Sequence, residues 1–416
     1  MMLTRKAIDF GVIRLLVFFI PFMFYINLIV QLNVSLADLF MMIVLLWFLI
    51  DHDNRKILAV VINKYHLILV YMLLLIYFCI LSMLNYITNT TIDFPYGVSA
   101  ILKLSVNFVY ITIFLVYLEK YKGEILNTIL KWWKYVAVII SLICIGSVFL
   151  YSNGNDYGLT LDGRAQGTFK DPNLAALYLI VSFTIIALLN LFSNKKTSIS
   201  LSMVIVLIAI LVTASRGGIL GISLGLMLVI FLSFIAGRVK ELFLFLIMTV
   251  LCSTIILWID SSSDVLSFAF ERVSGISVQE EGTSYRLFLW QSAIKVWEAN
   301  PIIGAGIGQF STYSHEMFGY TISHIPHNTY LSFLSETGLL GFIAFMWFPL
   351  FLISVLAIGL VSTGEKLYFY ALLGFVAIAI QALTINIENL RFIWIFITII
   401  FFIIKNDQKP LVAKGP

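Results

Sequence analysis

The chain has 416 residues, of which 61% are apolar and 12% are charged. A soluble globular domain carries roughly 45–50% apolar and about 25% charged residues, so this composition excludes a water-soluble protein. An aromatic content of 15% excludes disordered and collagen-like chains. The formal net charge of +4 assigns no partner by itself. We therefore expect an all-α, polytopic integral membrane protein.

Apolar runs of the length that crosses a bilayer recur along the chain. Such a span needs about 20 mostly apolar residues. The three cysteines lie inside these runs, so we expect neither a disulfide framework nor a cysteine-based metal site. We predict about 12 transmembrane helices, at 11–30, 34–50, 65–84, 98–118, 132–151, 174–193, 198–213, 219–236, 242–259, 339–361, 367–384 and 391–404.

Lysines and arginines predict how these helices are oriented. With both termini cytoplasmic, 17 of the 26 basic residues fall on the cytoplasmic side and 7 on the outer side. This split follows the positive-inside rule. Only 3 of the 17 are arginine, against 5 of the 7. Because the planar guanidinium group binds phosphate or carboxylate at two points, the outer arginines indicate recognition.

Two outer segments are long enough to carry a site, 152–173 and 260–327. Within the second, four apolar side chains share one face of an expected amphipathic helix: Leu287, Trp290, Ile294 and Trp297. The two tryptophans place that helix at the membrane interface, and it should end before Pro301. The sequence GAGIGQF that follows predicts a turn region, since no βαβ unit surrounds it.

Four short motifs follow one another on the predicted outer side. They are GRAQGTFKDPN at 163–173, SRGG at 215–218, R-x-x-x-W from Arg286 with a following P-x-x-G-x-G-x-G, and HNTYLSFLSETGLLG at 327–341. In this combination the chain resembles the O-antigen polymerase and ligase superfamily, over roughly residues 160–391. These bacterial membrane glycosyltransferases use a polyprenyl-diphosphate-linked glycan as donor. The motifs do not separate polymerases from ligases.

The resemblance implies roles for individual residues. Arg216 looks like the family arginine that holds the lipid diphosphate, Arg286 resembles a second one, and Arg164 matches an arginine of the first motif. His327 resembles a histidine implicated in catalysis. The resemblance further implies a GT-C type enzyme of the bacterial inner membrane, with its active site on the periplasmic side and with no metal or other cofactor.

The residue types themselves agree with this chemistry. Converging arginines stabilise a leaving diphosphate, and a helix capped by Asn328 and running to Gly338 would add its N-terminal dipole. Histidine has an ordinary pKa near neutral, so His327 is the candidate general base for the acceptor hydroxyl. Glu336 is a second catalytic candidate, although on an unbroken helix it would face away from His327.

Three more positions are secondary candidates, each of which also has a structural interpretation. Asp171, with Asn173, is expected to cap the helix that opens nearby. Arg391 follows an acidic residue at a span end, where an ion pair is expected. His324 stands three residues before the candidate base, but without a cysteine or an H-E-x-x-H pattern we expect no metal site.

We divide the chain into N-terminal helices (1–151), a ligase-like core (152–391), and a last helix with a cytoplasmic tail (392–416). Two elaborated outer segments suit two lipid-linked glycans. This favours a polymerase of O-antigen or capsule repeat units over a ligase that transfers glycan to lipid A-core or protein. The composition also allows a lipid-linked glycan transporter or a non-catalytic scaffold. Expected partners are the glycan donor and acceptor, membrane lipids and a chain-length regulator, and no nucleic acid.

Overall fold

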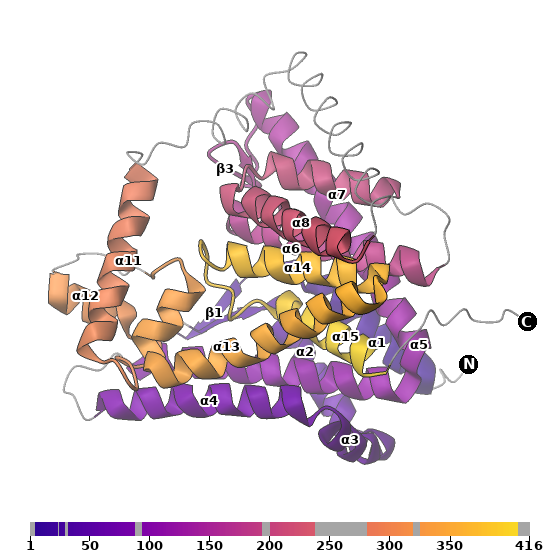
Figure 1. The fold of residues 1–416 in the computed structure, drawn as a ribbon, viewed down its shortest axis with the longest axis horizontal. Coiled ribbons are helices and arrows are strands. Elements are labelled where there is room, and N and C mark those ends of the chain that lie inside the picture. Colours follow the sequence, from indigo (N-terminus) through magenta and orange to yellow (C-terminus); the bar gives the residue numbers. More distant parts are fainter. Residues whose placement is uncertain are drawn as a thin grey trace, which may run out of the picture.

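The computed structural model describes residues 5–23, 25–29, 32–87, 94–193, 200–237, 281–318 and 325–406. These residues form mainly helices (Figure 1), which confirms the all-α class. The predicted span 242–259 and His324 lie outside the described residues. The first helices and strands are α1 (Arg5–Phe19), β1 (Tyr25–Ile29), β2 (Leu32–Ser35), α2 (Leu36–Ile50), α3 (His52–Lys64), α4 (His66–Ile87) and α5 (Phe94–Ser152).

The second half of the chain carries two hairpin strands and the remaining described helices. The elements are β3 (Thr160–Leu161), β4 (Arg164–Ala165), α6 (Pro172–Phe192), α7 (Leu201–Val212), α8 (Arg216–Ile235), α11 (Glu281–Ala299), α12 (Phe310–Phe318), α13 (Thr329–Thr363), α14 (Lys366–Gln381) and α15 (Arg391–Lys405). Among the residues that the structure describes, five helices are long and apolar enough to cross a membrane, namely α4, α5, α6, α8 and α13. The protein is therefore an all-α membrane protein, while the count of twelve spans stays a prediction.

One predicted span has a different boundary in the structure, and two others meet at a kink. The span predicted at 11–30 was wrong in its second half, because α1 ends at Phe19 and an antiparallel hairpin follows. Residues that pair across this hairpin include Tyr25 with Ser35. The runs 98–118 and 132–151 lie on either side of a kink in α5 at Lys122, where φ is +48° and the backbone is not helical. The two predicted spans therefore correspond to two helical parts of α5.

Hydrogen bonds and ion pairs connect several lysine-bearing helix ends, and these helix ends lie together at one end of the bundle. Lys120 Nζ, beside the α5 bend, donates to Asp9 Oδ2 and Asp51 Oδ2, each at 2.9 Å. Lys64 Nζ lies 2.9 Å from Glu119 Oε2. Asn406, just after α15, donates to the hydroxyl of Tyr65 at 2.8 Å. The start of α1 and the ends of α2, α3 and α15 therefore share what we call the terminal end.

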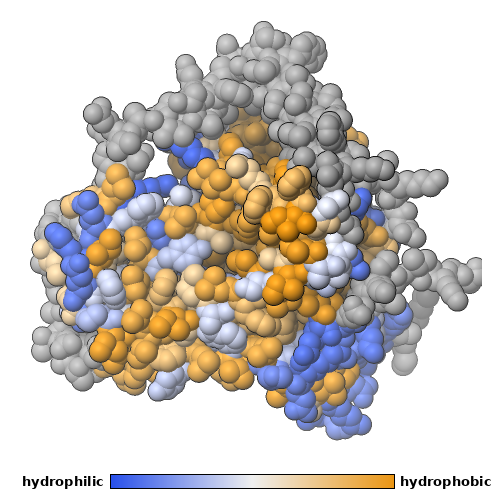
Figure 2. Space-filling view, in the orientation of Figure 1, coloured by the Kyte–Doolittle hydropathy of each residue, from blue (hydrophilic) through white to orange (hydrophobic). Residues whose placement is uncertain are grey.

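The opposite end of the bundle, which we call the loop end, carries α11 and α12 (Figure 1). Figure 2 shows hydrophilic residues at α3 and apolar surface over the middle of the molecule. Exposed apolar side chains on α8 belong to this surface: Leu220, Leu224, Met227 and Phe231. A polar end next to an apolar belt is the distribution that a bilayer stabilises.

Glycines bring α8 and α14 into close contact, side by side in Figure 1. A Cβ atom at Gly221 would lie 2.8 Å from the carbonyl oxygen of Ala377. Gly225, one turn after Gly221, also faces α14, whereas Gly217, one turn before it, faces Thr384 just after α14. Such spacing lets membrane helices approach closely. The contact fixes the first turn of α8, which carries Arg216, next to the segment that follows α14.

Candidate functional site

Arg164 is placed by a tight hairpin between β3 and β4. Leu161 pairs with Arg164, and Asp162 and Gly163 form the turn with φ of +51° and +74°. Two successive positive φ values are typical of the type I′ turn that Asp-Gly favours. Arg164 Nε donates to the carbonyl oxygen of Thr213 at 3.2 Å. The hairpin thus connects the first motif to the turn before α8.

Asn173 joins the first two motifs. Its Oδ1 accepts hydrogen bonds from Arg164 Nη2 at 3.2 Å and from Ser215 Oγ at 2.8 Å. Its carbonyl oxygen accepts one from Gln381 Nε2 at 2.7 Å. The cap of α6 is Asp171, whose Oδ1 accepts from the backbone N–H of Asn173 at 2.6 Å. Capping by Asp171 is confirmed, whereas the side chain of Asn173, only 7% exposed, bonds to other motifs instead.

Arg216 is the first residue of α8 and is half-buried. Ser215 caps this helix, with Gly218 N–H donating to Ser215 Oγ at 3.2 Å. A Cβ atom at Gly217 would lie 2.5 Å from Thr384 Oγ1. Arg216 therefore stands at a capped helix N-terminus that touches Asn173 through Ser215 and lies against the segment after α14.

His327 precedes the third capped helix. Its φ is +49°, and the Asn328 side chain accepts from the backbone N–H groups of Tyr330 and Leu331 at 3.0 and 3.1 Å. The N-cap role of Asn328 is thus confirmed. Trp290 Nε1 donates to the carbonyl oxygen of Pro326 at 3.1 Å. Because Arg286 lies about one turn before Trp290 on α11, the third motif packs beside His327.

The helix predicted from the third motif exists as α11, and its predicted apolar face is not the face that packs against the protein, so its place at the membrane interface stays a prediction. Leu287 and Ile294 are each 40% exposed. The buried side chains are Leu289, Ala293 and Val296, which pack with Ala305 and Phe310. Two apolar stripes run along this helix, and helical spacing alone does not decide which of them meets the protein.

The segment 382–390, between α14 and α15, contacts two of the four motifs, and Gln381 just before it contacts a third. Thr384 touches the first turn of α8, as described above. Thr329 N–H donates to the carbonyl oxygen of Ala382 at 2.9 Å, and Thr329 Oγ1 donates to that of Ile385 at 2.8 Å. Gln381, the last residue of α14, donates to the first motif. We call residues 382–390 the connecting segment. The sequence prediction missed the connecting segment because the predicted span ran to 384. The polar residues of the sequence TINIEN at 384–389 would have indicated a segment outside the helix.

A glycine contact joins the third and fourth motifs. Gly338 has φ of +64° and interrupts α13, as expected of a helix ending there. A Cβ atom at Gly338 would overlap the carbonyl of Ile302, and one at Gly304 would overlap that of Glu336. The interruption frees two carbonyl groups, and Ala305 and Gly306 donate to those of Ser335 and Glu336 at 2.9 Å. The glycine turns therefore fix the position of Glu336.

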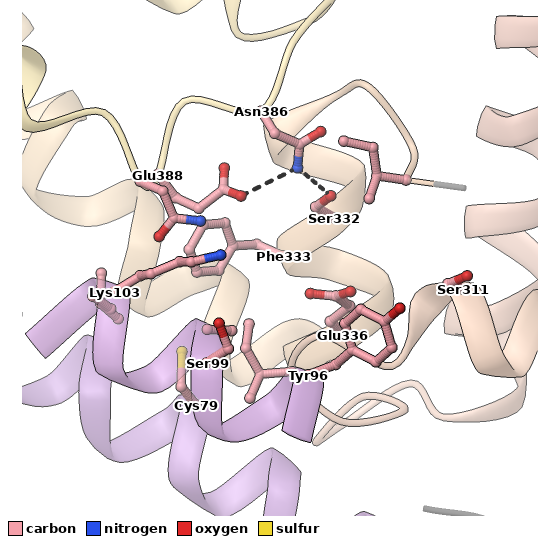
Figure 3. Close-up of a pocket in the computed structure, with 16 residues that line it drawn as sticks. Cys79, Tyr96, Ser99, Lys103, Ser311, Ser332, Phe333, Glu336, Asn386 and Glu388 are labelled. Atoms are coloured by element: carbon pink, nitrogen blue, oxygen red, sulfur yellow. Dashed lines mark hydrogen bonds between the residues drawn. The ribbon is translucent and has the colours of Figure 1, made fainter. Parts of the chain in front are cut away.

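Glu336 lines a cavity of about 400 Å³ beneath the connecting segment (Figure 3). Its Oε1 accepts from the backbone N–H of Phe310 at 3.2 Å. Glu388 lies across the cavity, where Asn386 Nδ2 donates to its Oε1 at 3.3 Å. Burial raises the pKa of the Glu388 carboxyl, although backbone hydrogen bonds and Asn386 oppose this shift. Further lining side chains are Tyr96, Ser99, Lys103, Ser311, Ser332 and Phe333.

Arg391 has a structural role at the start of α15. Its Nε and Nη2 donate to the carboxylate of Asp38 at 2.8 and 3.3 Å, and its Nη1 donates to Asn107 Oδ1 at 2.6 Å. The expected ion pair is therefore present, with a partner from α2. In the part of the chain that the structure describes, no group of three His, Cys, Asp or Glu side chains is arranged to hold a metal ion.

Backbone strain gathers at the same motifs. Four non-glycine residues among those described have positive φ: Lys122, Asp162, Ala214 and His327. Lys122 forms the bend of α5, and the other three lie in or next to the first, second and fourth motifs. Such conformations cost about 1–3 kcal/mol each and concentrate at functional sites. This distribution supports the motif cluster as the functional site.

The comparison with known families agrees with this location. Residues 201–346 match the model of the family described as O-antigen ligase. This range begins with α7 and ends in α13, so it includes Arg216, Arg286 and His327. A search of curated proteins gives no match. The match over residues 201–346 supports a relation to the O-antigen polymerase and ligase superfamily, whose members are glycosyl-transferring membrane enzymes.

Proposed function

We propose that the protein polymerises oligosaccharide repeat units linked to polyprenyl diphosphate. The observation that carries the proposal is the set of contacts around Asn173 and the connecting segment. They join Arg164 to the N-terminus of α8, where Arg216 lies, and to the start of α13, next to His327. Guanidinium groups beside capped helix N-termini suit a diphosphate.

The proposed reaction transfers a glycan from one lipid carrier to another. The oxygen of an acceptor hydroxyl attacks the anomeric carbon of the donor sugar. The bond between that carbon and the diphosphate oxygen breaks, and its electron pair leaves with the polyprenyl diphosphate. His327 accepts the proton of the acceptor hydroxyl. Arg216, Arg286 and Arg164 stabilise the charge of the leaving diphosphate without a metal ion, so we expect a chelator to leave the activity unchanged.

We further propose that the loop end faces the periplasm and that both termini lie in the cytoplasm. The distribution of lysines and the grouping of Lys64 and Lys120 at the terminal end support this orientation. The enzyme would then act on lipid-linked units that have already crossed the inner membrane. A regulator of chain length is the partner that such a polymerase needs.

Deletion of the gene distinguishes a polymerase from a ligase. Without a polymerase, cells still cap their lipid A-core with a single repeat unit. Without a ligase, the core stays bare and long glycan accumulates on the polyprenyl carrier. We expect the first pattern, because two elaborated outer segments suit two lipid-linked substrates. The second pattern would overturn the proposal of a polymerase and leave a ligase.

A further inference from the structure

The cavity beneath the connecting segment contains buried acceptor atoms with no function in the reaction described above. Glu388 Oε2 and Asn386 Oδ1 are buried and have no hydrogen-bond partner among the described residues. An acceptor in this state loses the free energy of hydration unless a ligand or water donates to it. The cavity therefore provides acceptor atoms for a molecule rich in hydroxyl groups.

These acceptor atoms are held rigidly by the surrounding helices. The carbonyl oxygen of Glu388 accepts hydrogen bonds from Asn107 Nδ2 and Trp394 Nε1, each at 2.9 Å. Asn386 Nδ2 donates to Ser332 Oγ at 2.7 Å as well as to Glu388 Oε1 (Figure 3). A site whose groups are already ordered costs little conformational entropy when a ligand binds.

The composition of the cavity selects a neutral ligand rather than the diphosphate. The amine of Lys103 also lines the cavity, but it stands against the two carboxyl groups of Glu336 and Glu388 on opposite walls, and this balance disfavours a doubly charged anion. Hydroxyl and amide groups, with the rings of Tyr96 and Phe333, instead suit the hydroxyls and the apolar face of a sugar. The volume of about 400 Å³ is within the roughly 300–1,000 Å³ of ligand pockets.

The position of the cavity relates it to one of the two substrates. Along α13, Glu336 lies eight residues after Asn328, which corresponds to about 12 Å of helix. The connecting segment touches α8 through Thr384 and lines the cavity through Glu388. A glycan of several sugar residues is therefore long enough to present one hydroxyl to His327 while another of its sugars occupies the cavity.

We propose that this cavity binds a sugar residue of the acceptor glycan, with Glu388, Asn386 and Glu336 accepting hydrogen bonds from its hydroxyl groups. The inference rests on the proposed function, because it assigns the second substrate of that reaction. It makes these three residues determinants of which acceptor the enzyme extends.

Binding of the repeat-unit glycan to the purified full-length protein tests this inference. The probe is the oligosaccharide that mild acid releases from the polyprenyl carrier of the producing cells, with a fluorescent label at its reducing end. Glu388→Gln keeps the oxygen that accepts from Asn386 but replaces the other acceptor oxygen, Oε2, with an NH2 donor, and we expect the Kd to rise about tenfold or more. Asn386→Ala should have a similar effect. Glu365→Gln, at the exposed turn before α14, is the matched control and should leave the Kd unchanged.

Transfer kinetics separate this inference from the proposed function. With wild-type activity established, Glu388→Gln should raise the KM for the acceptor and leave the KM for the lipid-linked donor unchanged. If folded Glu388→Gln and Asn386→Ala proteins keep the wild-type Kd and the wild-type KM for the acceptor, the sugar site is refuted and the proposed function is not affected. Glycan binding without any transfer by the wild-type protein would instead overturn the proposed function.

Discussion

Replacing Gly338 by alanine tests the contact that joins the third and fourth motifs. The combination of φ +64° and ψ −169° at Gly338 is essentially restricted to glycine and costs an alanine about 2 kcal/mol. The new methyl group would also overlap the carbonyl of Ile302 and displace the adjoining loop. Leu339 and Leu340 would then lose hydrogen bonds to the carbonyls of Pro301 and Ile302, at about 1 kcal/mol each. We expect a total loss of about 3–4 kcal/mol.

The free energy of unfolding of the purified protein, from titration with SDS, measures this loss. Gly146→Ala is the matched control, because Gly146 lies in α5 with φ in the helical range and open space around its Cβ position. Alanine there should stabilise the protein by up to about 1 kcal/mol. If Gly338→Ala and Gly146→Ala unfold alike, the proposed contact between the glycine turns and α13 is refuted.

Three further predictions concern contacts elsewhere in the bundle. Arg391→Ala leaves the half-buried carboxylate of Asp38 without its arginine, and unfolding titrations should show a loss of up to about 3 kcal/mol. Burial alone would raise the pKa of Asp51, but hydrogen bonds from Lys120 and a backbone N–H hold it below 3.8, so this network stabilises the fold above that pH. Melting curves should show Asp51→Asn less stable at pH 7, with the difference shrinking on acidification. Gly221→Val should separate α8 from α14 and lower the melting temperature, which the exposed Leu220→Val should not do.

The elements that sequence predicts best are those with strong local signals. The N-caps at Asp171 and Asn328 follow from side-chain chemistry within three residues, and so does the interruption at Gly338. The Asp-Gly turn that places Arg164 has an equally local signal, and it would have predicted the β3–β4 hairpin.

Features that depend on tertiary contacts did not follow from the sequence. The packed face of α11 depends on which apolar stripe meets Ala305 and Phe310. Asn173 looks like a cap residue in the sequence, and only the approach of α8 and α14 makes it a junction between motifs. The partner of Arg391 is Asp38, which lies 353 positions away in the chain. Motif order therefore predicted the family, whereas the arrangement of the site required the structure.

The guanidinium group of Arg216, at the N-terminus of α8, is central to the proposed reaction. The most direct test is the rate of glycan transfer by purified protein in lipid, with the repeat unit on its native polyprenyl diphosphate as donor. Lysine keeps the charge but lacks the bidentate fork, so Arg216→Lys should be slower by about 100-fold or more. Arg55→Lys, at the exposed start of α3, should keep the wild-type rate. A wild-type rate in Arg216→Lys would contradict diphosphate binding by that arginine.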